Sequence, residues 1–148
     1  MRMLFIFVLL ASITAVRTGY GTWVDFYIQA VCDKPFWCFN AQMIETDIDE
    51  DDLLKKLEEQ CTSEPKINVL LRGYETGDGF GDFDIEVMAR TTANCTNDGS
   101  NIELKTKEFE YNTWFWPTLT GKEWNSETEY IKLDFIRREI TYGTKRFE

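Results

Sequence analysis

The segment Val24–Cys32 alternates apolar and polar side chains, and this alternation constrains the fold more than any other feature. Positions 24, 26, 28, 30 and 32 are apolar or cysteine, whereas Asp25, Tyr27 and Gln29 stand between them. A period of two places successive side chains on opposite faces of an extended chain. The segment is therefore predicted to be a strand with one face against a core.

Similar alternation recurs along the chain. Apolar positions alternate with polar ones at Phe39–Met43, Ile67–Leu71, Phe83–Ala89, Ile102–Leu104 and Ile131–Phe135. Turn-forming residues such as glycine, proline and asparagine separate these segments. About seven short strands with turns between them predict a mainly β protein, an antiparallel β-sandwich of the immunoglobulin-like kind.

One segment has a helical pattern instead. Leu53, Leu54, Leu57 and Cys61 fall on one helical face, and the acidic run Asp47–Asp52 precedes them. Acidic side chains at a helix start interact favourably with the helix dipole, and Pro65 predicts where the helix ends. We therefore expect one short helix, of about ten residues, between the second and third strands.

The N-terminus has the features of a secretory signal peptide over residues 1–19. Arg2 supplies a positive charge, Leu4–Ala11 are nearly all apolar, and small residues follow. This apolar run is shorter than the roughly 20 residues of a membrane-spanning helix. We expect a secreted, extracellular protein without a transmembrane segment, in which residues 20–148 form a single domain.

Four cysteines follow this leader: Cys32, Cys38, Cys61 and Cys95. An even number of cysteines in an oxidising compartment predicts two disulfides. Three pairings are possible, and the sequence does not choose between them. Asn94 begins an Asn-Cys-Thr sequon and is a candidate glycosylation site, although a disulfide at Cys95 would weaken it.

The chain has a net charge of −10 and contains no histidine. The negative charge disfavours binding to nucleic acid or to anionic lipid. The absence of histidine excludes Ser-His-Asp and Cys-His nucleophiles and imidazole metal ligands. We therefore predict a protein that is not an enzyme and has no cofactor, with a small carboxylate-dependent hydrolase as the least favoured alternative.

The acidic run partly matches a calcium-binding loop. Asp47, Asp49 and Asp51 stand at the first, third and fifth positions of the EF-hand pattern, but Asp52 occupies the sixth position, where glycine is required. A solvated loop is the preferred interpretation, and no metal is predicted. A weak, irregular calcium site at these three aspartates is kept as an alternative.

The candidate ligand-binding residues are three tryptophans near the C-terminal third of the chain: Trp114, Trp116 and Trp124. Exposed indole rings could stack on sugars or hold an apolar ligand. The competing interpretation is that alternate rings fill the sandwich core, because one face of any strand in a sandwich is buried.

Several short motifs follow one another between residues 24 and 87. A strand ends at Val31-Cys32 and is followed by Lys34-Pro35, Asn40-Ala41, Asp51-Asp52-Leu53-Leu54 and Gly81-Asp82-Phe83-Asp84-Ile85. This order resembles the nematode transthyretin-like family of secreted proteins. The chain departs from the family in its early helix and in lacking the histidine-containing segment typical of the second half.

The resemblance implies a transthyretin-like β-sandwich that is extracellular and non-enzymatic. On this basis we expect a binding protein that carries an apolar small molecule or lipid, or that bridges to a cell-surface protein. The alternative is an extracellular carbohydrate-binding module that uses the tryptophan-rich segment. Hydroxyisourate hydrolase activity, which related enzymes have, is not implied because it requires histidines.

Overall fold

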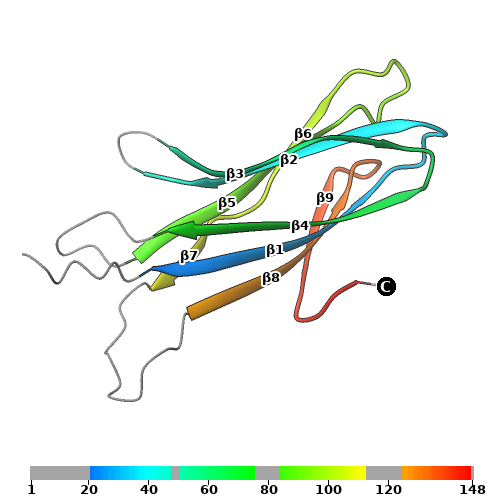
Figure 1. Ribbon diagram of the computed structural model, residues 1–148. Helices are drawn as coiled ribbons and strands as arrows, with labels where there is room; N and C mark the ends of the chain where they lie inside the picture. The colour runs from blue at the N-terminus through cyan, green and yellow to red at the C-terminus, as the bar shows by residue number, and fades with distance from the viewer. Residues whose placement is uncertain (1–20, 48–50, 76–83, 113–124, 148) are drawn as a thin grey trace, which may run out of the picture.

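The computed structural model describes residues 21–47, 51–75, 84–112 and 125–147. The described residues form nine strands and no helix, and consequently no helix long and apolar enough to cross a membrane (Figure 1). The strands are β1 (Thr22–Val31), β2 (Trp37–Glu45), β3 (Asp52–Thr62), β4 (Lys66–Glu75), β5 (Asp84–Ala93), β6 (Ile102–Lys105), β7 (Phe109–Asn112), β8 (Asn125–Asp134) and β9 (Glu139–Gly143).

These strands form two sheets that face each other, as the predicted sandwich requires. The four-stranded sheet has the order β4-β1-β8-β9. The five-stranded sheet has the order β3-β2-β5-β6, and β7 also pairs with β5. All pairs are antiparallel except β1 with β8, which are parallel. In Figure 1, β1 lies between β4 and β8 in one layer, with β2 and β3 in the other.

The core lies between the two sheets and confirms the alternation predicted for the first strand. Val24, Phe26 and Ala30 are fully buried, and they face residues of β2 such as Phe39 and Met43, which are also fully buried. Burying a large apolar side chain stabilises the folded state by about 1.5–3 kcal/mol. The packing of these two central strands is therefore a main source of the free energy of folding.

The predicted helix is wrong, because this segment is strand β3. Its antiparallel register to β2 shifts twice, and one shift leaves Leu54 as an extra residue between Leu53 and Lys55. An extra residue of this kind reverses which face the following side chains occupy. Leu54 and Leu57 can therefore both pack against the core, although their spacing is that of a helix.

The described residues contain nine strands rather than about seven. The predicted helix is strand β3, and β7 and β9 follow the strands predicted at Ile102–Leu104 and Ile131–Phe135. The last predicted strand is a hairpin of β8 and β9, with Arg138 in its turn at a positive φ of 59°. Residues 102–112 contribute two short strands, β6 and β7, which both pair with β5. The segment between them bonds to β5 at Ala89, whose backbone N–H donates to the Thr106 hydroxyl oxygen.

Both predicted disulfides are present, and the pairing is Cys32–Cys95 and Cys38–Cys61. Cys32 and Cys95 are buried and join the end of β1 to the segment after β5. Cys38 and Cys61 join the neighbouring strands β2 and β3, with 4.0 Å between their Cα atoms. Two disulfides fit an extracellular protein, because such bonds form and persist in oxidising compartments.

Candidate binding face

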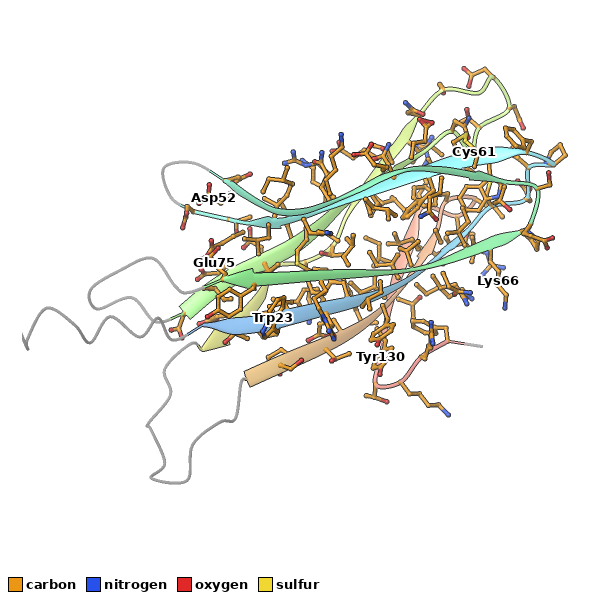
Figure 2. All side chains as sticks on the ribbon, in the orientation of Figure 1. Trp23, Asp52, Cys61, Lys66, Glu75 and Tyr130 are labelled. Carbon is orange, nitrogen blue, oxygen red and sulfur yellow. A yellow bond between two sulfur atoms is a disulfide. The ribbon has the colours of Figure 1, made fainter. Side chains whose placement is uncertain are left out.

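The outer surface of the four-stranded sheet carries several aromatic side chains, and we call it the aromatic face. Strand registers place its side chains in five rows that cross β4, β1, β8 and, in the last three rows, β9. The rows are Tyr74/Trp23/Ser126, Arg72/Asp25/Thr128, Leu70/Tyr27/Tyr130/Gly143, Asn68/Gln29/Lys132/Thr141 and Lys66/Val31/Asp134/Glu139. Figure 2 labels Lys66, Trp23 and Tyr130, one from each of β4, β1 and β8.

Four aromatic rings on this face form two pairs. The ring centroids of Trp23 and Tyr74 are 5.0 Å apart, and those of Tyr27 and Tyr130 are 5.3 Å apart with nearly parallel planes. Each pair joins side chains that are direct neighbours on adjacent strands, which is the arrangement that stabilises a sheet most. Trp23 is 38% exposed and Leu70 is 43% exposed, so this apolar surface is accessible to solvent.

An ion pair lies between the two ring pairs. The Arg72 guanidinium donates from Nε to Oδ1 of Asp25, at 2.7 Å, and from Nη2 to Oδ2, at 2.5 Å. The pKa of Arg72 is raised mainly by the hydrogen bond to Asp25 and also by its charge. Asp25 is buried beneath this contact, and the Arg72 guanidinium carbon lies 6.0 Å from the centroid of the Trp23 ring. The guanidinium is thus held in a fixed orientation, with its Nη1 group outside the bidentate contact.

Further contacts hold the side chains of the third and fourth rows of the aromatic face. The Gln29 side-chain amide donates to Oδ1 of Asn68 at 3.1 Å. The C-terminal tail, residues 144–147, folds back so that the Arg146 guanidinium lies 5.2 Å from the centroid of the Tyr27 ring. Arg146 and Phe147 line a small pocket with Gln29, and this pocket has room for about one water molecule.

The outer surface of the five-stranded sheet has a different character. Its central strands present Asn40 and Gln42 from β2, and Arg90 and Thr92 from β5. Polar side chains are the usual composition of a sheet surface that faces solvent. Apolar side chains form one row on this surface, in which Leu53 of β3, Ile44 of β2 and Met88 of β5 are neighbours on adjacent strands. The aromatic face is therefore the unusual one of the two outer surfaces.

The candidate tryptophans Trp114, Trp116 and Trp124 lie outside the described residues, so their prediction stays untested. The aromatic residues that the structure does bring together were not singled out from the sequence. The alternation of β1 does place Tyr27 opposite the core, but its stacking on Tyr130 depends on the pairing of β1 with β8.

The predicted calcium ligands are only partly described, because Asp49 falls outside the described residues. Asp51 lies 3.8 Å from the Arg90 guanidinium. Asp47 has carboxylate oxygens within 4.8 Å of those of Glu45 and Asp52, a grouping that the EF-hand pattern did not predict. Acidic side chains gather in this way in many proteins without a bound ion, and we assign no metal to them.

The predicted glycosylation site lies in a hydrogen-bonded connection after β5. The side-chain oxygen of Asn94 accepts a hydrogen bond from the Cys38 backbone N–H at 2.7 Å, and the Asn94 backbone N–H donates to the Cys38 carbonyl. The next residue, Cys95, is held in a buried disulfide. Glycosylation of Asn94 would therefore have to precede the formation of these contacts or leave them intact.

Glu129 and Tyr111 form a polar contact on the inner side of β8, at 3.3 Å between the Tyr111 hydroxyl and Oε1 of Glu129. Burial raises the pKa of Glu129. The pKa of Tyr111 is also raised, first by burial and then by the negative charge of Glu129. A tyrosine with a raised pKa is a poor nucleophile, because nucleophilic attack requires the deprotonated or readily deprotonated hydroxyl.

Comparison with known protein families identifies the family to which this chain belongs. A family described as Caenorhabditis elegans protein of unknown function (DUF870) matches residues 26–135. The chain belongs to this family. Membership of DUF870 is consistent with the nematode origin that the sequence resemblance implied. No curated protein and no solved structure matches the chain.

Proposed function

We propose that this protein is a secreted, non-enzymatic binding protein and that its aromatic face holds an extracellular carbohydrate. The observation that supports this proposal is the arrangement of the face itself. Two ring pairs, Trp23–Tyr74 and Tyr27–Tyr130, flank an ion pair whose groups are fixed by hydrogen bonds. Exposed apolar surface on one side of a protein commonly marks an interaction site.

Carbohydrates suit such a face because a sugar ring has both apolar and polar parts. The C–H groups on one side of a sugar ring pack on an aromatic ring, and its hydroxyls require hydrogen-bond partners. Trp23 and Tyr74 offer ring surface in the first row, and Arg72 offers a fixed polar group in the second row. Asn68 offers one in the fourth row, beside the row of Tyr27 and Tyr130. Fixed polar groups beside apolar surface are the usual composition of a ligand site.

The expectation of a carrier for an apolar molecule or lipid named no site, and one form of it, with the ligand between the two sheets, receives less support. In the described residues the space between the sheets is occupied by buried side chains, including Phe26, Phe39 and Phe135. The small pocket beside Arg146 is too small for a lipid chain. A surface ligand such as a cell-surface glycan is compatible with both the filled core and the expected bridging role.

A transthyretin-like fold remains our proposal for the detailed architecture. The two facing sheets, with β1 at the centre of one of them, are compatible with the sandwich that the resemblance implies. The described residues contain no helix, so this point rests on sheet arrangement alone. Secretion and a signal peptide over residues 1–19 also remain proposals, which two disulfides support.

The test is a glycan array probed with the purified, oxidised protein, followed by titration calorimetry with the oligosaccharide that binds best. Trp23→Ala should weaken binding at least about tenfold, which corresponds to about 1.4 kcal/mol. The matched control is Leu53→Ala, which removes an exposed apolar side chain (56% exposed) from the five-stranded sheet.

Both variants should keep the β-sheet circular dichroism of the parent. The melting temperature should stay unchanged in Leu53→Ala and fall by roughly a few degrees in Trp23→Ala, which loses the ring contact with Tyr74, so binding is compared at a temperature where both variants are folded. Equal loss of binding in the two variants, or unchanged binding in Trp23→Ala, would show that the aromatic face is not the site. Failure of every glycan to bind would reject carbohydrate as the ligand.

A further inference from the structure

The aromatic face differs in charge from the rest of this acidic protein. Its first four rows contain one carboxylate, Asp25, and that carboxylate is neutralised by Arg72. Lys132 in the fourth row and Arg146 in the overlying tail add two further positive charges, and the structure shows neither in a salt bridge with a described residue. Three cations and one carboxylate give the first four rows together with Arg146 a net charge of +2, and the fifth row, with Lys66, Asp134 and Glu139, adds −1. The chain as a whole has a net charge of −10, so this face is locally positive on an acidic protein.

The cations are spread across the face rather than gathered at one point. Arg72 and Lys132 are separated by two strands and two rows, or about 16 Å between Cα atoms for ideal sheet spacing. Arg146 lies between them, because its guanidinium packs over the ring of Tyr27 in the intervening row. An oligosaccharide of several linked sugar units is long enough to contact Arg72, Arg146 and Lys132 at once, whereas a single sugar would contact only one of these cations.

Each of the three cations keeps N–H donors accessible to a ligand. Arg72 binds Asp25 through Nε and Nη2, and its side chain is 56% exposed, so Nη1 can donate outward. Arg146 is exposed, and Lys132 is partly exposed. Guanidinium groups bind sulfate and carboxylate oxygens with short, charge-assisted hydrogen bonds.

We propose that the carbohydrate bound by the aromatic face is acidic, an oligosaccharide that carries sulfate or carboxylate groups. This inference rests on the proposed function. Rings of Trp23 and Tyr74 pack on the sugar rings, and Arg72, Arg146 and Lys132 bind the anionic groups. A polyanion would otherwise be repelled by the acidic protein, so the local positive charge both permits and orients binding.

The experiment compares three soluble probes by calorimetry: a sulfated heparin-derived hexasaccharide, a hyaluronan hexasaccharide, which carries carboxylates only, and neutral chitohexaose. Vesicles that contain phosphatidylserine serve as a fourth probe, because a lipid headgroup also offers an anion. At least one acidic hexasaccharide should bind about tenfold or more tightly than chitohexaose, and its affinity should fall as salt is raised.

The test variant is Lys132→Gln/Arg146→Gln, and the control is Lys56→Gln/Lys105→Gln, which removes the same charge from the five-stranded sheet. Lys56 and Lys105 are about half exposed, so their replacement leaves the core intact. The test variant should lose about tenfold in affinity for the acidic probe and none for chitohexaose. The control should retain the parent affinity for every probe.

The outcomes separate this inference from the function on which it rests. Equal binding of neutral and acidic probes, with Trp23→Ala still weakening both, would overturn the acidic ligand and keep the carbohydrate function. Binding to vesicles and to no oligosaccharide would overturn both. An equal loss of acidic-probe binding in the test and control variants would show that net charge, rather than this face, attracts the ligand, and would also overturn the inference.

Discussion

Replacing Cys32 and Cys95 by alanine opens a disulfide that joins positions 63 residues apart, whereas the Cys38–Cys61 disulfide joins positions 23 residues apart. A disulfide stabilises mainly by restricting the unfolded chain, and the restriction grows with loop length. At 25 °C, loop entropy gives about 4 kcal/mol for the 63-residue separation and about 3 kcal/mol for the 23-residue separation.

Burial should widen this difference. Cys32 and Cys95 are buried, so their replacement also leaves space in the core, while Cys61 is exposed at the edge strand β3. Loss of buried sulfur contacts adds to the entropy term. We therefore expect Cys32→Ala/Cys95→Ala to reduce the free energy of unfolding by at least about 1 kcal/mol more than Cys38→Ala/Cys61→Ala.

The assay is urea unfolding of the oxidised proteins, followed by tryptophan emission and by circular dichroism. The pairing itself is checked on the parent by digestion with Asp-N, which cleaves before Asp33 and so separates Cys32 from Cys38. An equal or larger loss of stability in Cys38→Ala/Cys61→Ala would refute the reasoning. A disulfide-linked peptide pair that joins Cys32 to Cys61 would refute the pairing.

Two further predictions concern the buried side chain of Phe26 and the titration of Glu129. Phe26→Ala should reduce the free energy of unfolding by about 3–5 kcal/mol in urea unfolding, because Phe26 is fully buried, whereas Phe36→Ala (63% exposed) should change it by about 0.5 kcal/mol or less. Burial raises the pKa of Glu129, so the folded state binds a proton on this carboxyl group more tightly than the unfolded chain does. The free energy of unfolding should therefore fall as pH rises from about 4.5 through the raised pKa of the folded state. Glu129→Gln should remove this dependence of stability on pH and raise the melting temperature at pH 7. A stronger pH dependence or a lower melting temperature in this variant would contradict the prediction.

Part of this fold follows from local pattern. The strands with strict alternation, such as β1 and β5, could be predicted because one face is buried and the other is not. Strand β3 could not, because its bulge at Leu54 exists only when the segment pairs with β2. In isolation the same leucine spacing is typical of a helix, and tertiary pairing overrides that local preference.

The candidate site depends still more on long-range pairing. The sequence showed that Asp25, Tyr27 and Gln29 lie opposite the core face of β1, but it did not show what lies beside them. Tyr130 reaches Tyr27 because β8 pairs in parallel with β1, and Arg72 reaches Asp25 because β4 pairs on the other side. Parallel pairing of distant strands leaves no local signal, so the aromatic face could not be recognised before the registers were known.

The central claim is that ligand binds on the outer surface of the four-stranded sheet. The most direct measurement is a nuclear magnetic resonance titration of isotope-labelled protein with the oligosaccharide that binds best. The largest chemical-shift changes should fall on the Trp23 indole N–H and on backbone amides near Leu70, Arg72 and Tyr130. Changes concentrated instead around Asn40, Gln42 and Arg90, on the five-stranded sheet, would contradict it.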